Sequence, residues 1–145
     1  MPSLEKIATQ LRARHPGVPL LVFPRGATYA LEAMQRIGYD VVTMDTSVDR
    51  TKLRAELEAA AADKVPLHGR VSGLQGNLEV AVLEKDKGNT PADVQKAVRT
   101  MLEELGPQNL IANLGEGLTG KEDPVLVAAF IDSVHQISEE MIKAQ

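Results

Sequence analysis

Four short segments of this 145-residue chain carry side chains that suit ligand binding or acid–base chemistry. Each segment follows a short apolar run: Pro24-Arg25-Gly26, Asp45-Thr46-Ser47, Gln75-Gly76-Asn77 and Gly115-Glu116-Gly117. Together they offer one cation, two carboxylates and several amide or hydroxyl groups. Such groups bind anions, move protons or hold a polar ligand by hydrogen bonds. If the four segments meet in the fold, they form a candidate functional site.

The candidate substrate-binding residues are Arg25, Gln75, Asn77 and Asn113, because each lies at or beside the predicted end of a strand. Arg25 is the one cation at a predicted strand end. It either binds an anionic ligand through two parallel hydrogen bonds or is an ordinary surface arginine. The sequence leaves both alternatives open.

Two carboxylates, Asp45 and Glu116, also stand at predicted strand ends. If both face one cavity, they form a carboxylate pair for general acid–base catalysis. In the alternative, which we favour, Asp45 accepts hydrogen bonds from the backbone of its own loop.

Residues 115–120, Gly-Glu-Gly-Leu-Thr-Gly, match the G-x-G-x-x-G pattern of dinucleotide-binding loops. Their context differs from that fingerprint, because the next helix begins only at Asp123-Pro124 and no strand with an acidic end follows it. Glu116 would also bring a negative charge to the diphosphate. We therefore expect a glycine-rich loop that needs left-handed backbone or close backbone approach.

Composition excludes several classes of function. The chain has no cysteine, so it forms no disulfide, thiolate nucleophile or zinc–thiolate site, and its three histidines lack metal-ligand spacing. We expect no metal. A net charge of −4 disfavours binding to nucleic acid. No apolar run approaches the roughly 18 residues of a membrane span, and the first residues lack a signal-peptide apolar region.

The elements that must position these residues alternate between helix and strand. Strands are predicted at 18–23 and 39–44, at a segment ending at 74–77, and at 109–114. Helix starts are predicted at Ser3, Asp49, Thr90-Pro91 and Asp123-Pro124, because these residues cap a helix or suit its first position. The expected inward faces are Leu4, Ile7, Ala8 and Leu11 in the first helix, and Val127, Phe130, Ile131, Val134, Ile137 and Met141 in the last.

Short, continuously apolar strands separated by helices predict an α/β fold with a parallel sheet. Right-handed crossovers place all four strand C-termini, and hence the four polar segments, on one side. Residues 65–70 are expected to form a loop or a small hairpin, and residues 84–89 a charged surface loop. The charged side of the helix after Asp49, including Arg50 and Arg54, is expected to face solvent. The whole chain, 1–145, is predicted to be one domain.

Several segments resemble the uroporphyrinogen decarboxylase family. The most specific are 74–78, Leu-Gln-Gly-Asn-Leu, and 111–118, Ile-Ala-Asn-Leu-Gly-Glu-Gly-Leu. Segments 101–107 and 123–135, and upstream 38–45, are also similar, in the same order as in the family. The resemblance implies a (β/α)8 barrel, usually a homodimer, that converts uroporphyrinogen III to coproporphyrinogen III at the strand C-termini without a metal or organic cofactor.

Two departures from the family stand out. The resemblance covers only the C-terminal half of the barrel, and 145 residues is about half of what such a barrel needs. The family's arginines for substrate carboxylates and its aspartate for the pyrrole N–H groups belong to the other half. The family motif Asn-Leu-Gly-His-Gly here reads Asn113 to Gly117 with Glu116 at the position of the active-site histidine, which is our one catalytic candidate. A glutamate repels a polycarboxylate substrate unless it is protonated or paired with a cation. The absence of cysteine excludes the related zinc methyltransferases.

Three hypotheses follow. The chain is the C-terminal half of a decarboxylase, inactive alone, that needs an N-terminal half-barrel and then a porphyrinogen substrate. Alternatively, it is a non-catalytic structural or interaction subunit of a larger assembly, derived from the decarboxylase. In the third, it is a small α/β domain that binds an anionic ligand near Arg25.

The open edges and apolar inner face of a half-barrel argue against a persistent open monomer. We expect a homo-oligomer, a complementary half-barrel, or the first helix covering that face. The expected compartment is the cytoplasm, with a plastid or another organelle as the alternative.

Overall fold

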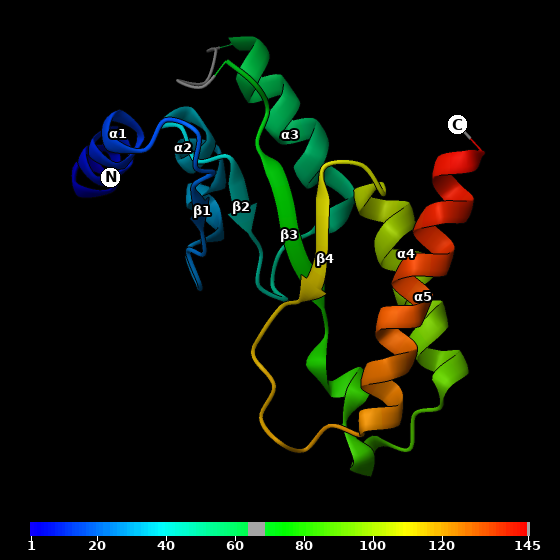
Figure 1. Cartoon of the computed structure of the whole chain (residues 1–145). Coiled ribbons are helices and arrows are strands. Elements are labelled where there is room, and N and C mark those ends of the chain that lie inside the picture. The colour runs from blue at the N-terminus through cyan, green and yellow to red at the C-terminus, as the bar shows by residue number, and fades with distance from the viewer. Residues whose placement is uncertain (64–68, 145) are drawn as a thin grey trace.

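The computed structural model describes residues 1–63 and 69–144, so most of the predicted loop or hairpin at 65–70 lies outside the described residues. Four parallel strands form one sheet in the order β1-β2-β3-β4. Helices alternate with them, which confirms the predicted α/β fold (Figure 1). The strands are β1 (Leu21–Val22), β2 (Val41–Thr43), β3 (Gly73–Leu78) and β4 (Leu110–Leu114). The helices are α1 (Pro2–Arg14), α2 (Leu31–Arg36), α3 (Arg50–Asp63), α4 (Pro91–Leu105) and α5 (Pro124–Lys143).

The described residues also form three short 3-10 helices. They are η1 (Thr28–Ala30), η2 (Val80–Leu83) and η3 (Lys85–Lys87). The last of these lies in the segment expected to be a charged surface loop, and its residues are exposed.

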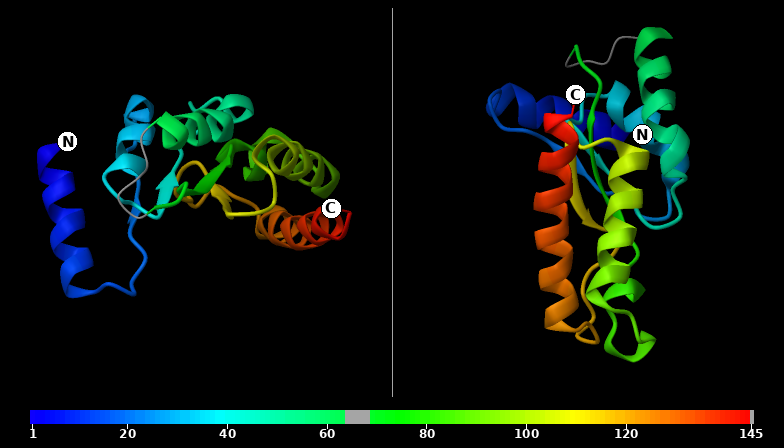
Figure 2. Two further views of the ribbon diagram at one scale, coloured as in Figure 1. Left: turned by 90° about the horizontal axis from the view of Figure 1, so that it is seen from above. Right: turned by 90° about the vertical axis from the view of Figure 1, so that its right-hand side faces the viewer.

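The helices cover one face of the sheet. Viewed from above, α2, α3 and α4 follow one side of the curved sheet, α1 and α5 lie at its two ends, and no described helix covers the other face (Figure 2). The core lies between the sheet and the helices, where apolar side chains leave water. Its fully buried members include Val42, Met44, Leu57, Leu74, Val94, Val98, Met101, Leu102 and Ile137.

The opposite face of the sheet, here called the bare face, is open to solvent and mostly apolar, with Thr43, Gln75 and Asn113 as its polar side chains at the C-terminal ends of the strands. Leu21, Phe23 and Ile111 lie on or beside it and are each about half exposed. Because β1 and β4 each have one strand neighbour, both edges of the sheet are also open. The arrangement resembles part of a (β/α)8 barrel, in which the sheet closes on itself and has no open edge.

The predicted starts of the last two helices are confirmed. Thr90 and Asp93 form a reciprocal capping box at the start of α4, with Pro91 at its first position. Asp123 caps α5 by accepting a hydrogen bond from the Val125 N–H. Both caps bind backbone N–H groups that have no partner inside the helix.

Three details of the predicted helices were wrong. Ile7 and Leu11 were expected to face inward in α1 but are exposed, because α1 lies at one end of the sheet (Figure 2); of that expected face, Ala8 is buried and Leu4 partly buried.

Ser3 does not cap α1, because the helix already begins at Pro2, whose fixed φ suits the first helical position. Ile131 was expected to face inward in α5 but is exposed. The buried line of that helix runs instead through Leu126, Phe130, Ser133 and Ile137, because this side packs against α4.

The charged side of α3 was expected to be a solvated face, and this was also wrong for two arginines. Arg50 forms an ion pair with Glu104 of α4, with 2.7 Å between Nε and Oε2. Arg54 donates to the backbone oxygen of Leu105, the last residue of α4, and to that of Gln108 just beyond the helix. These side chains therefore link α3 to its neighbour in the helical layer.

Candidate functional site

The C-terminal ends of the strands meet at a cavity of about 500 Å³ on the bare face, here called the mouth cavity. Its lining residues come from all four strands and the loop after β4: Leu21, Val22, Phe23, Thr43, Gln75, Asn113, Leu114, Glu116, Gly117 and Leu118. Three of the predicted site residues, Gln75, Asn113 and Glu116, are thus brought together. The walls are otherwise mostly apolar, as is usual for a site that holds an organic ligand.

Arg25 joins this group through an ion pair across the mouth. Its Nη2 donates to Glu116 Oε2 at 3.0 Å, which connects the loop after β1 to the loop after β4. The two side chains are 66% and 45% exposed. Glu116 is therefore paired with a cation, yet the pair remains open to solvent and to exchange with an incoming anion.

The amide groups in the cavity are each partly engaged. Thr43 Oγ1 donates to Gln75 Oε1 at 3.1 Å, and Asn113 Oδ1 accepts from the Leu114 N–H at 2.8 Å. In the described part of the chain, neither side-chain NH2 group has a protein acceptor. Both donors can therefore reach a carboxylate or carbonyl oxygen in the cavity.

Asp45 acts as a structural acceptor rather than as the partner of Glu116. Its carboxylate accepts from the Gly26 N–H at 2.8 Å and from the backbone and hydroxyl of Ser47. The hydroxyl of Ser47 and then the Gly26 N–H lower the pKa of Asp45, although burial opposes them. The favoured interpretation, a carboxylate that holds its own loop, is confirmed.

Asn77 does not line the mouth cavity. Its Nδ2 donates to the backbone oxygen of Asp45 at 2.7 Å, and the side chain lines a different cavity between the sheet and the helices. The preceding Gly76 has a φ of +129°, and a Cβ there would lie 2.9 Å from the Met44 oxygen. Only glycine meets both conditions at this position.

The glycine-rich segment after β4 is a loop, as expected. A Cβ at Gly115 would lie 2.9 Å from the Thr46 nitrogen, so two loops touch there, and Gly120 has a φ of +91°. Glu122 holds the end of this loop by accepting from the Thr119 hydroxyl and from the Thr119 and Gly120 N–H groups. These hydrogen bonds, the Thr119 N–H first, lower the pKa of Glu122 to about 2.

The sequence analysis missed the role of Glu122. The signal was a Thr followed three positions later by a Glu, the same spacing as a capping box. It was overlooked because no helix begins at Thr119.

Within residues 1–63 and 69–144, no cluster of three or more His, Asp or Glu side chains is placed to hold a metal ion. No helix there is long and apolar enough to cross a membrane.

Comparison with known proteins gives a consistent result. The sequence model of the family described as uroporphyrinogen decarboxylase matches residues 1–137. The uroporphyrinogen decarboxylase of Salinibacter ruber is 39% identical over 142 residues, which are 97% of this chain and 36% of that protein. The human protein of that name is 34% identical over 143 residues, 95% of this chain and 35% of its own length. The mouse protein is 36% identical over 121 residues, 83% of this chain and 29% of its own. The chain spans about a third of the length of these curated relatives.

Proposed function

The chain belongs to the uroporphyrinogen decarboxylase family, and from this membership we propose that it is the C-terminal half of a decarboxylase barrel, inactive alone. Once complemented by an N-terminal half, the barrel would convert uroporphyrinogen III to coproporphyrinogen III. The observation that carries this proposal is the mouth cavity. It lies at the C-terminal strand ends, where barrel enzymes bind substrate, but only four strands wall it and it opens onto the bare face.

The residues of the mouth cavity suit a supporting role in such a site. Gln75 and Asn113 offer amide donors, and Arg25 offers a guanidinium that can bind a substrate carboxylate. To bind a substrate carboxylate, Arg25 must release Glu116. Glu116 and the substrate therefore compete for the Arg25 guanidinium. Glu116 occupies the position of the family's histidine, and we infer that this exchange lowers activity even in a complete barrel.

The same geometry favours an assembly over a solitary chain. The bare face exposes apolar side chains to water, and both edge strands of the sheet are open. Closure of a barrel would cover both features. A complementary half-barrel would cover the apolar face and both strand edges at once. The alternative is a homo-oligomer of this chain. A non-catalytic interaction subunit would use the same face. A separate anion site near Arg25 has less support, because no cation is among the described residues that line the mouth cavity and Glu116 there is negative.

The test is a decarboxylation assay with uroporphyrinogen III. We expect no product from the chain alone, and product when an N-terminal half-barrel from a relative is supplied in trans. In the complemented barrel, Glu116→His should raise the rate about tenfold or more, as restoring a positioned acid–base group does.

Glu103→His on the exposed side of α4 is the matched control and should leave the rate unchanged. Turnover by the chain alone would overturn the proposed dependence on a partner. A folded, complemented barrel that makes no product with either residue at position 116 would instead favour the non-catalytic subunit.

A further inference from the structure

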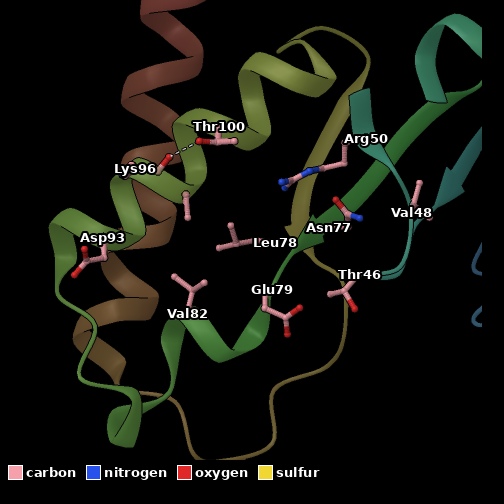
Figure 3. Close-up of a pocket in the computed structure, with 11 residues that line it drawn as sticks. Thr46, Val48, Arg50, Asn77, Leu78, Glu79, Val82, Asp93, Lys96 and Thr100 are labelled. Atoms are coloured by element: carbon pink, nitrogen blue, oxygen red, sulfur yellow. Dashed lines mark hydrogen bonds between the residues drawn. The ribbon is translucent and has the colours of Figure 1, made fainter. Parts of the chain in front are cut away.

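A second cavity, here called the helix cavity, lies on the helix-covered side of the sheet. It has a volume of about 460 Å³ and is bordered by the end of β3, the segment leading into α3, η2 and the first half of α4 (Figure 3). The residues that line it are Thr46, Val48, Arg50, Asn77, Leu78, Glu79, Val82, Asp93, Lys96, Ala97 and Thr100. None of them lines the mouth cavity, so this site does not depend on the proposed function.

Asn77 places an unsatisfied acceptor in this cavity. The residue is only 4% exposed, and its Nδ2 is fixed by the hydrogen bond to the Asp45 oxygen. This bond assigns the other amide atom as Oδ1, which has no hydrogen-bond partner in the described part of the chain. Figure 3 shows this oxygen on the side of Arg50. A buried acceptor without a partner is costly, so a ligand that donates to it gains that free energy.

Arg50 supplies the complementary donors. Its guanidinium extends into the same cavity, and its Nε is paired with Glu104 at 2.7 Å. No other ion pair or hydrogen bond of this side chain occurs among the described residues, which leaves both terminal nitrogens open. Two terminal guanidinium nitrogens match the two oxygens of a carboxylate.

The remaining groups define what else the ligand must carry. Glu79 and the hydroxyl of Thr46 also face the cavity without a described partner, so a positive N–H donor has acceptors there (Figure 3). The charged lining residues sum to zero: Arg50 and Lys96 against Glu79 and Asp93. Because the negative charge of Glu104 also offsets the positive charge of Arg50, binding of a ligand that carries only negative charge is disfavoured. The floor is apolar and consists of Val48, Leu78, Val82 and Ala97.

From these contacts we propose that the helix cavity binds a small zwitterion, an α-amino acid with an apolar side chain. Its carboxylate lies on the terminal nitrogens of Arg50, and its ammonium donates to Asn77 Oδ1 and to the carboxylate of Glu79. Its side chain packs on the apolar floor. The third N–H of the ammonium donates to the Thr46 hydroxyl, so each open polar group is used once. Because the two charges of the zwitterion cancel, its binding leaves the net charge of the cavity unchanged.

The experiment is a titration of the isotope-labelled chain with L-leucine, followed by amide proton–nitrogen NMR. We expect saturable shifts at residues 46, 50, 77 and 79. Two probes each lack one of the proposed recognition groups and keep the side chain of leucine. Leucine betaine (N,N,N-trimethyl-L-leucine) keeps the carboxylate but has no N–H donor, and isopentylamine keeps the ammonium but has no carboxylate. Each should bind at least tenfold more weakly than leucine.

Variants separate the site from general effects on folding. Arg50→Gln should weaken leucine binding at least tenfold, and Thr46→Val or Glu79→Gln about threefold. Arg99→Gln is the matched control, because Arg99 also pairs α4 with another helix, at Glu140, but lies outside the helix cavity. It should leave the affinity unchanged. The proposal is overturned if leucine gives no saturable shift, if leucine betaine binds equally well, or if Arg99→Gln weakens binding as much as Arg50→Gln.

Discussion

At the scale of single residues, the two strand-end carboxylates show how surroundings decide a role. Asp45 is buried, and its carboxylate accepts hydrogen bonds from three donors on the neighbouring loops. Its negative charge therefore stabilises those loops. Glu116 is exposed and has one partner, Arg25, on another loop. A carboxylate whose oxygens are saturated by backbone N–H groups is a poor proton carrier. Of the two, only Glu116 is placed to meet a ligand in the mouth cavity.

The Arg25–Glu116 pair should contribute little to stability. Both side chains are well exposed, so water and salt screen their attraction and ordering them costs entropy. We expect a coupling free energy below about 1 kcal/mol in a double-mutant cycle of Arg25→Gln and Glu116→Gln, measured by urea unfolding. The value should fall further in 1 M salt. A coupling above about 2 kcal/mol would mean that a ligand cannot readily replace Glu116.

At the scale of elements, the buried carboxylate of Asp40, directly before β2, joins three parts of the chain at the N-terminal ends of the strands. Its carboxylate accepts from Arg12 of α1 at 2.7 Å, from the Leu20 N–H at 2.8 Å and from Arg70 at 2.6 Å. Burial raises the pKa of Asp40, but these three donors outweigh it and hold the pKa well below its usual range. The side chain thus joins α1 and the segments that precede β1 and β3 to the segment before β2.

This anchor predicts a specific acid sensitivity. Because the folded pKa of Asp40 is depressed, its contribution is complete above the unfolded pKa of about 3.9 and is lost as the pH falls below that value. Asp40→Asn should cost about 2 kcal/mol of unfolding free energy at pH 7 and should flatten the loss of stability below pH 4. Urea unfolding from pH 2.5 to 7 measures both effects. Asp86→Asn, on the exposed η3 turn, should leave the dependence of the unfolding free energy on pH unchanged. If Asp40→Asn gave the same pH dependence as the wild type, the proposed role of Asp40 would be contradicted.

The capping box of α4 gives an independent check on how that helix starts. Thr90→Ala removes the side-chain oxygen that accepts from the Asp93 N–H, so we expect a loss of about 1 kcal/mol in unfolding free energy. Thr100→Ala makes the same change in the middle of the same helix. Since alanine favours helix interiors, it should be neutral or slightly stabilising. Equal losses at the two positions would show that the cap contributes nothing beyond side-chain size.

Elements with strong local signals were predictable from the sequence. Thr90-Pro91 and Asp123-Pro124 combine a cap with a first-turn proline, and both start helices where expected. Features that depend on tertiary contacts were not. The strand expected at 18–23 narrows to Leu21–Val22, because it pairs with β2 alone and Pro19 lacks an N–H to donate. Nor could a one-dimensional pattern show that Asn77 leaves the mouth cavity while Gln75 lines it.

At the scale of the whole molecule, the sheet has one covered face and one bare face. α2, α3 and α4 cover the first, whereas Leu21, Phe23 and Ile111 on or beside the second meet solvent (Figure 2). A barrel avoids this exposure by closing the sheet on itself. The four strands here cannot close alone, since closure takes about eight. We therefore expect another chain or another half of a barrel to stabilise this chain if it covers the bare face, because these apolar side chains would then leave water.

We accordingly expect the isolated chain to self-associate and to bind an apolar dye, both through the bare face. Phe23→Ser combined with Ile111→Thr should lower dye fluorescence and shift the mass found by light scattering toward the monomer. Because both side chains are already exposed, the unfolding free energy should change by less than about 1 kcal/mol. Val125→Ser removes an even more exposed apolar side chain from α5, away from the sheet, and should change neither readout. A wild-type chain that is monomeric and binds no dye would show that the bare face needs no partner. Equal effects of the double variant and Val125→Ser would show that association runs through the helices instead.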